Sequence, residues 1–200
     1  MTISALIFDL GGVLLRTLDP APRQRLAERF GMSREALEEL VFEGASGRRA
    51  QRGEITVEGH WSNLGQLLKL DSRQMEEFRR EFWSGDRLDA ELVGLIRAYR
   101  RRYRTALLSN AFSNVRWLLE TRWGIADAFD EMVISSEVGR VKPDPAIYQM
   151  VVERLGVALG EALMVDDFVR NVEAARAVGL QAVQFRDLDQ LRADFKRLGI

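Results

Sequence analysis

Seven polar side chains that could take part in chemistry lie at, or soon after, the ends of four short apolar segments. One acid at the end of an apolar segment is common and carries little information. It is less expected by chance that four such ends carry three acids, a hydroxyl and a lysine. The set is informative if the fold brings these ends together at one edge of a sheet. The side chains are Asp9 in IFDLGGVL, Ser109 and Asn110 in ALLSNA, Lys142 in SSEVGRVKPDP, and Asp166, Asp167 and Asn171 in LMVDDFVRN.

The chemistry of this set is that of a phosphate site with a bound cation. Clustered carboxylates repel one another unless a hard cation lies among them, and Mg²⁺ prefers one or two carboxylates with waters and a phosphate. Lys142 would neutralise phosphate charge, and the Ser109 hydroxyl with nearby backbone N–H groups would hold other phosphate oxygens. Asp9 can attack phosphorus to form an aspartyl-phosphate, which splits one hard hydrolysis into two steps. Gly11 and Gly12 let the chain turn sharply, so that backbone groups approach the ion and the phosphate.

Short apolar segments that alternate with helical patterns predict the fold that positions these residues. This order is typical of a parallel sheet with helices on both faces. Asp144 followed by Pro145 predicts a helix start, and Gly156 predicts its end; residues 172–178 form a similar helix that ends at Gly179. The sequence therefore predicts a doubly wound, Rossmann-like α/β fold. Its predicted strands are residues 3–8, 105–108, 132–134, 162–165 and 181–185.

The first and second predicted strands are separated by far more residues than one crossover helix needs. Helical periodicity fills this gap at residues 23–30, 33–42, 56–70 and 71–83, with Ser33, Thr56 and Asp71 as predicted N-caps. We therefore expect residues 16–85 to form an all-helical cap, inserted into an α/β core made of residues 1–15 and 86–200. An insertion after the first strand lies where open α/β sheets bind ligands, which predicts a mobile lid. Gly85 lies at one of its predicted junctions.

Composition excludes several other classes of function. The 29 basic residues nearly balance the 30 acidic ones, so no net field draws the protein to nucleic acid or to anionic lipid. The sequence has no cysteine, which excludes disulfides, zinc–thiolate sites and cysteine nucleophiles. The apolar start at residues 3–15 contains Asp9 and lacks the flanks of a signal peptide, and no run reaches the ~18 apolar residues of a membrane span.

We expect a cytoplasmic monomer or homodimer that acts on a small-molecule phosphate ester, with neither nucleic acid nor membrane as a partner.

The four segments together resemble the motifs of the haloacid dehalogenase superfamily, in its capped, phosphatase-like subfamily. All four motifs occur in order over residues 3–185: an aspartate at a strand end, a serine or threonine at a strand end, a lysine before proline, and an acidic pair. The helical insertion is similar to the small cap of that family. The resemblance implies that Asp9 is the nucleophile and that Ser109, the backbone of Asn110, and Lys142 contact the phosphate.

The same resemblance implies a Mg²⁺ site. Asp9, the carbonyl of Gly11 and Asp167 would bind the ion, and Asp166 would act through a water molecule. Asn171 would orient Lys142 or the acidic pair.

Gly11 departs from the family's phosphatase pattern, which normally has a second aspartate there as the general acid and base. Loss of that group lowers the rate of hydrolysis roughly 10²–10⁴-fold unless another group replaces it. The leaving group could need little help, as with a sugar 1-phosphate; a cap residue such as Glu43 or His60 could protonate it; or the site could bind phosphate and turn over poorly. Some family members that act on sugar 1-phosphates resemble this chain in having glycine there, which favours the first explanation.

Two rival functions remain open. A 2-haloacid dehalogenase would use the same aspartate without a metal, but Asp166 and Asp167 would then repel both Asp9 and an anionic substrate. A non-catalytic phosphate-binding module is supported by Gly11 alone, and it would have no use for the nucleophile.

Other charged and aromatic residues have simpler explanations than a role in the site. We expect the stretch with Arg48, Arg49 and Arg52 to be a solvated loop. Trp83 would pack at the hinge, and His60 would be packed or exposed. The arginines between 97 and 104 lie at the end of one amphipathic helix, where cations suit the helix dipole.

Overall fold

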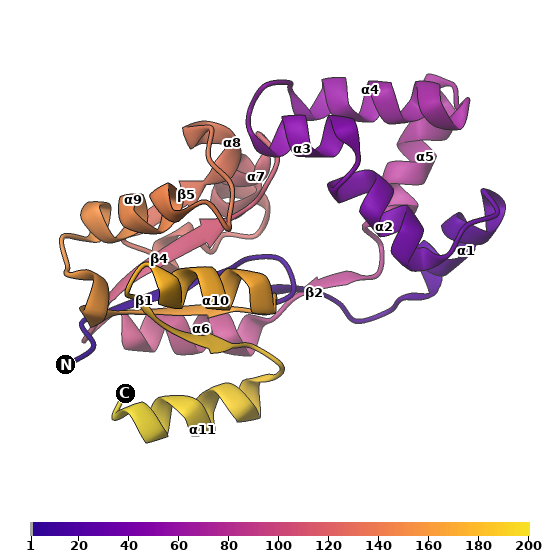
Figure 1. Cartoon of the computed structure of the whole chain (residues 1–200). Coiled ribbons are helices and arrows are strands. Elements are labelled where there is room, and N and C mark those ends of the chain that lie inside the picture. Colours follow the sequence, from indigo (N-terminus) through magenta and orange to yellow (C-terminus); the bar gives the residue numbers. More distant parts are fainter. Residues whose placement is uncertain (1) are drawn as a thin grey trace.

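A five-stranded parallel sheet forms the centre of the computed structural model, which describes residues 2–200. The strand order is β5-β4-β1-β6-β7, so that β1 lies in the middle with β4 and β6 on either side (Figure 1). Residues that follow these three strands are therefore neighbours at one edge of the sheet. The strands are β1 (Ala5–Phe8), β4 (Arg104–Ser109), β5 (Glu131–Ile134), β6 (Ala162–Asp166) and β7 (Gln181–Gln184).

Helices cover both faces of this sheet. Leu6 and Phe8 of β1 lie in a hydrophobic cluster with α6 and α11, whereas Ala5 and Ile7 lie in a second cluster with α9 and α10. Because both faces are buried, β1 is apolar at every position, as is usual in parallel sheets. The predicted doubly wound α/β fold is confirmed. The covering helices are α6 (Ala90–Tyr99), α9 (Pro145–Leu155), α10 (Val169–Ala177) and α11 (Leu188–Leu198).

Helix boundaries in the core follow the cap signals of the sequence, with some differences. Helix α9 begins after Asp144, whose side chain accepts a hydrogen bond from Ala146 N at 3.0 Å, and it ends before Gly156 at φ 68°, as predicted. Helix α10 begins earlier than predicted, at Val169, and α11 was not predicted although Asp187 caps it. The short elements are α7 (Val115–Trp117), α8 (Ser135–Val138), a π-helical turn η1 (Leu118–Arg122), and the 3-10 turns η2 (Ala126–Ala128) and η3 (Leu159–Glu161).

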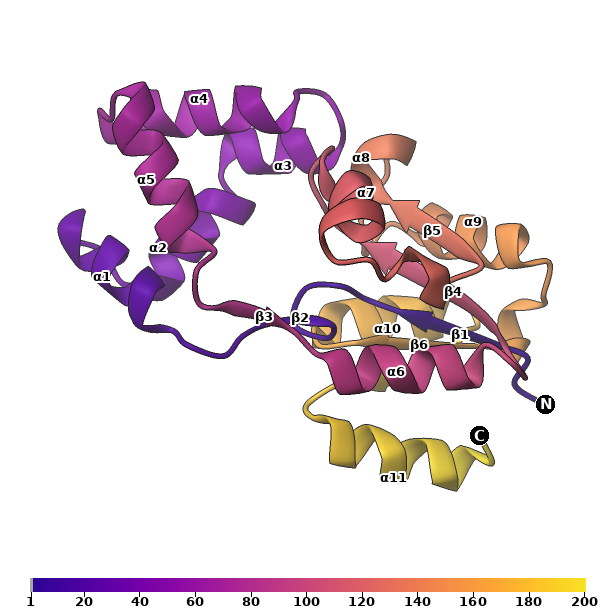
Figure 2. The same ribbon diagram turned by 180° about the vertical axis from the view of Figure 1, so that it is seen from behind.

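Five helices, which lie between residues 21 and 82, form a separate block beside the sheet (Figure 2). They have a hydrophobic cluster of their own, which includes Leu37, Trp61 and Phe78. The stretch with the arginines at 48, 49 and 52 belongs mostly to α3, so the expected loop is wrong, whereas the three arginine side chains are exposed to solvent as expected. The helices are α1 (Ala21–Arg29), α2 (Arg34–Phe42), α3 (Ala45–Gln51), α4 (Val57–Leu68) and α5 (Ser72–Phe82). Within residues 2–200, no helix has the length and apolar character to cross a bilayer.

An antiparallel two-stranded ribbon joins this block to the core, and the sequence did not predict it. Strands β2 (Leu15–Thr17) and β3 (Asp86–Leu88) are too short to show an alternating pattern. The pairing extends beyond the two strands, because Gly85 O accepts hydrogen bonds from the backbone N–H groups of Leu18 and Asp19, which follow β2. A Cβ at Gly85 would lie 1.9 Å from Asp19 O, so this glycine permits close approach of two strands. The division of the chain at residues 16 and 85, and the motion of the block as a lid, stay predictions.

Phe112 provides a second attachment between the helical block and the core. It follows β4, yet its side chain is buried in the hydrophobic cluster of the block. Its ring centroid lies 4.8 Å from that of His60 and 6.3 Å from those of Trp61 and Phe42. Any separation of the block from the core would therefore expose a large aromatic surface.

We predict that Phe112→Ala weakens this attachment and lowers the free energy of unfolding by about 3 kcal/mol, since it removes a buried aromatic ring. Amide hydrogen exchange in α4 should become faster than in the central sheet. Phe195→Ala is the matched control: Phe195 is also buried, but it packs in the sheet cluster against Phe8 and Tyr99. If both variants change the exchange of α4 equally, Phe112 is not an attachment point.

Candidate active site

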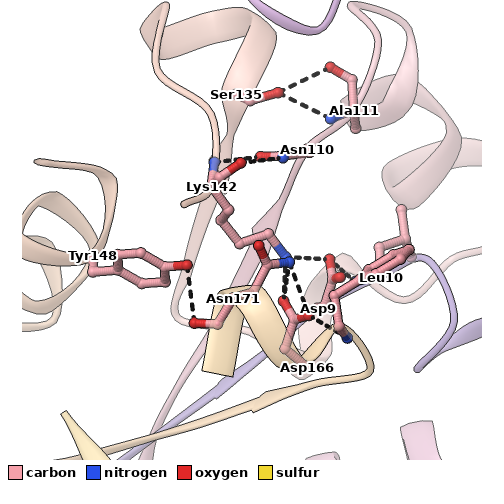
Figure 3. A network of polar contacts seen from close by, with 10 residues as sticks. Asp9, Leu10, Asn110, Ala111, Ser135, Lys142, Tyr148, Asp166 and Asn171 are labelled. Atoms are coloured by element: carbon pink, nitrogen blue, oxygen red, sulfur yellow. Dashed lines mark hydrogen bonds and ion pairs between the residues drawn. The ribbon is translucent and has the colours of Figure 1, made fainter. Parts of the chain in front are cut away.

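The carboxyl ends of β1, β6 and the segment after β5 bring three charged side chains together (Figure 3). Lys142 Nζ lies 2.8 Å from Asp9 Oδ1 and 2.6 Å from Asp166 Oδ2. All three side chains are buried. Asp9 Oδ1 also accepts a hydrogen bond from Leu10 N at 2.7 Å, whereas Oδ2 accepts none from residues 2–200 in the structure.

Asp166 has its hydrogen-bonding capacity filled by protein groups. Besides Lys142, it accepts hydrogen bonds from Phe168 N at 2.9 Å and from Asn171 Nδ2 at 2.9 Å and 3.1 Å. Asn171 is held in turn, because Tyr148 Oη donates to its backbone carbonyl at 3.1 Å. This arrangement suits a carboxylate that fixes the lysine more than one that binds an ion directly.

Asp167 has the opposite environment. Its Oδ1 is buried without a hydrogen-bond partner among the described residues, and its carboxylate oxygen lies within 4.8 Å of oxygens of Asp9 and Asp166. Gly12, at φ 75°, makes room for it, since a Cβ there would lie 2.1 Å from Asp167 Oδ2. An unpartnered carboxylate oxygen beside two others fits a hard divalent cation, which prefers oxygen ligands. Asp9 and Asp167 are therefore the side chains that could hold such an ion.

Burial and mutual repulsion make these carboxylates costly to ionise. Burial raises the pKa of Asp9 to about 7; Lys142 opposes this rise, and Asp166 and Asp167 add to it. Burial also raises the pKa of Asp167 to about 6, with a further contribution from Asp166. Burial alone would lower the pKa of Lys142, but the carboxylates of Asp9 and Asp166 raise it above its ordinary value. The lysine is therefore charged. Once the neighbouring acids ionise, their negative charge exceeds the single positive charge of the lysine.

The remaining predicted site residues lie at the same edge. Ser109 ends β4 and is buried. Asn110 follows it and directs its side-chain amide at the backbone of Lys142, with which it makes two hydrogen bonds. Ser135, which was not predicted, accepts a hydrogen bond from Ala111 N at 2.9 Å. No motif in the sequence distinguishes this serine, because its role depends on the pairing of β4 with β5. The structure thus brings the predicted residues together, and their roles stay predictions.

Gly11 is exposed, does not have a positive φ, and would meet nothing within 4 Å of an added Cβ. Neither candidate from the helical block is well placed to replace a missing acid. His60 is fully buried, its Nδ1 lies 2.9 Å from Ser46 Oγ, and burial lowers its pKa to about 4, so it is neutral at pH 7. Glu43 pairs with Arg170 at 3.2 Å, so proton donation would first require this ion pair to break.

Three of the five arginines between residues 97 and 104 have acidic partners on the protein itself. Arg97 pairs with Asp127 at 2.7 Å, and Asp130 lies 3.0 Å from Arg100 and 3.4 Å from Arg104. These ion pairs offset part of the positive charge at this place, and the absence of nucleic acid as a partner stays a prediction. Trp83 packs against Phe42 and so serves the helical block.

Comparison with protein families gives one match that spans most of the chain. A family model described as haloacid dehalogenase-like hydrolase matches residues 3–179. Among curated proteins, a phosphatase of Mycobacterium tuberculosis is 30% identical over 91% of this chain and 87% of its own length. A sesquiterpene phosphatase of Aspergillus oryzae is 26% identical over 93% and 91% of the two chains. A phosphorylated carbohydrates phosphatase of Thermotoga maritima is 28% identical over 90% and 84%.

Solved structures share the fold. A haloacid dehalogenase family enzyme from Bacteroides thetaiotaomicron, solved as a magnesium complex, superposes with a TM-score of 0.77 at 22% identity, over 96% of this chain and 99% of that one. A dehalogenase solved with an intermediate superposes with a TM-score of 0.66 at 19% identity, over 92% and 85%. At these identities the likeness concerns the fold alone.

We predict that Gly12→Ala weakens Mg²⁺ binding by about tenfold or more, since the added Cβ displaces Asp167 from the carboxylate cluster. Gly11→Ala is the matched control, because the neighbouring position has open space and an ordinary φ. Calorimetric titration of the folded, metal-free variants with Mg²⁺ measures the effect. Equal affinity in Gly12→Ala and in the unmodified protein would show that Asp167 is not a ligand.

Proposed function

Because the chain belongs to the haloacid dehalogenase-like hydrolase family, we propose that it is a Mg²⁺-dependent phosphatase that hydrolyses a phosphate monoester of a small metabolite. The family predicted from the four motifs is confirmed by the match over residues 3–179. One observation carries the proposal: Asp9 is buried beside a charged lysine, with one carboxylate oxygen held and the other free of hydrogen bonds from the described residues. This arrangement supports the proposal that Asp9 is the nucleophile, because it leaves one oxygen available for attack.

In the proposed reaction, Asp9 Oδ2 attacks phosphorus. The new bond joins that oxygen to phosphorus, and the bond to the leaving oxygen breaks, so that the leaving group departs with the electron pair. Water then attacks the aspartyl-phosphate, which releases inorganic phosphate and regenerates the carboxylate. Two easier steps replace one difficult displacement.

The other residues of the site would stabilise charge on the phosphate. Lys142, whose position between two carboxylates keeps it charged, would neutralise one phosphate oxygen, and Ser109 with the backbone N–H of Asn110 would hold others. Asp9, Asp167 and the carbonyl of Gly11 would hold Mg²⁺, which supplies electrostatic stabilisation of the developing negative charge. Asp166 and Asn171 would keep the lysine in place.

Gly11 limits the substrates that such a site can process quickly. With no acid at this position, and with His60 buried and neutral and Glu43 in an ion pair, the leaving oxygen departs without a proton from the protein. Esters of acidic alcohols, anomeric or aryl, would then be the better substrates. Relatives named for sesquiterpene and for carbohydrate phosphates support a small organic phosphate, a sugar phosphate among the candidates.

The helical block lies on the same side of the sheet as the site, since Glu43 at the end of α2 contacts Arg170 of α10, close after Asp167. This contact supports the proposal that the block is a cap that covers the substrate. Lids of this kind exclude water and complete the catalytic set. The cytoplasmic location and the state as a monomer or homodimer stay predictions from the sequence.

The test is kcat/KM for phosphate esters of graded leaving-group acidity, measured with Mg²⁺ and with a chelator. We predict that activity requires Mg²⁺ and rises steeply with the acidity of the leaving alcohol. Gly11→Asp should flatten this dependence, because a carboxylic acid can protonate a poor leaving group; the gain for poor leaving groups would be roughly 10²–10⁴-fold. Open space and an ordinary backbone conformation at Gly11 make this variant compatible with the fold.

Other results would overturn particular parts of the proposal. Hydrolysis of phosphate esters that is undiminished in chelator would remove Mg²⁺ from the proposal. A flat dependence in the unmodified protein would show that another group already supplies the proton. No turnover of any ester, with phosphate still bound, would favour a binding module.

A further inference from the structure

Within the part of the chain that the structure describes, one distant side chain, that of Asn110, hydrogen-bonds to the backbone of Lys142. Lys142 lies in a turn between α8 and α9, outside any helix or strand. Its carbonyl accepts a hydrogen bond from Asn110 Nδ2 at 2.9 Å, and its N–H donates to Asn110 Oδ1 at 2.7 Å (Figure 3). Each backbone polar group of the lysine therefore has its partner in the same amide.

This pair of hydrogen bonds requires the chemistry of a primary amide. An amide places a donor and an acceptor side by side, whereas an aspartate offers acceptors alone and an aliphatic side chain offers neither. The two bonds close a ring, which fixes the separation and the orientation of the two segments.

Asn110 is itself held by its neighbours. It follows Ser109, the last residue of the central strand β4, and precedes Ala111. Ala111 N donates to Ser135 Oγ at 2.9 Å, and Ser135 Oγ lies 3.3 Å from Ala111 O, a second reciprocal contact. Ser135 is fully buried at the start of α8, directly after β5. The asparagine is thus anchored to two strands of the sheet.

We infer that Asn110 is a positioning residue that acts through Lys142. Lysine has a long, flexible side chain, and the place of its ammonium depends on where its backbone is held. The contacts of Nζ with Asp9 and Asp166 require that backbone to lie at one distance from the ends of β1 and β6. The amide of Asn110 sets this distance, in addition to the phosphate contact that its backbone makes in the proposed function on which the inference rests.

A double-mutant cycle distinguishes positioning from a purely structural role. Asn110→Ala should weaken binding of inorganic phosphate, in the presence of Mg²⁺, by about 10- to 100-fold, since a displacement of the order of 1 Å in a charged group has effects of this size. In a Lys142→Ala background the same substitution should have no further effect, because residues that act through one another are not additive. Calorimetry measures both. The Lys142 ammonium signal of ¹⁵N-lysine-labelled, metal-free protein should be lost or shifted in Asn110→Ala.

Thr105→Val is the control for loss of a buried hydrogen bond in the same strand. Thr105 lies at the other end of β4, and its Oγ1 donates to Ala128 O at 2.8 Å. The substitution Thr105→Val should lower the melting temperature and leave both the phosphate affinity and the Lys142 signal unchanged. If Asn110→Ala does not fold, Asn110→Ser, which keeps one hydrogen-bonding group, is measured in the same way.

Three results would overturn the inference: unchanged phosphate affinity in the folded variant, an equal loss of affinity in the Lys142→Ala background, or an unaltered lysine signal. Failure of the proposed function would be seen separately, as an unmodified protein that hydrolyses no ester. The lysine signal would still test the positioning role in that case.

Discussion

Three carboxylates and one ammonium share a buried place at the carboxyl ends of the central strands, and their charges do not balance. Asp9, Asp166 and Asp167 could carry three negative charges, against one positive charge on Lys142. Because burial strengthens the repulsion among the acids, the site is stable at neutral pH only if the acids hold protons or a cation joins them. The raised pKa values of Asp9 and Asp167 express this constraint in the protein alone.

Much of the local structure follows from the need to hold these charges in position. Asp166 is saturated by Lys142, Asn171 and a backbone N–H, and so acts as the fixed counter-charge of the lysine. Asp167 keeps one oxygen without a hydrogen-bond partner among residues 2–200, beside a glycine that leaves room for it. The helical block is attached by the β2–β3 ribbon and by Phe112, and the ion pair of Glu43 with Arg170 links it to α10, close after Asp167.

The parts of this site that could be predicted from the sequence are those that depend on one strand at a time. Asp9 and the acidic pair follow continuous apolar runs, and parallel pairing then forces their ends together. The amide contact between Asn110 and Lys142 could not be predicted, because it depends on how two loops meet. The same holds for Phe112, which belongs to the core by sequence and to the helical block by packing. The strands of the β2–β3 ribbon are three residues long, too short to show an alternating pattern. Helix α11, by contrast, has an N-cap signal at Asp187 and a C-cap signal at Gly199 in the sequence.

The charge imbalance of the site is tested most directly by counting the protons released when Mg²⁺ binds. Metal-free protein is titrated calorimetrically at pH 6.5 in two buffers that differ in ionisation enthalpy. Folded-state pKa values of about 7 for Asp9 and about 6 for Asp167 mean that protons are held at this pH and must leave before the carboxylates bind the ion. We predict one Mg²⁺ per chain, release of about one proton on binding, and much less release at pH 8.5, where the acids are already ionised. Binding at pH 6.5 without proton release, or no binding at all, would contradict the account.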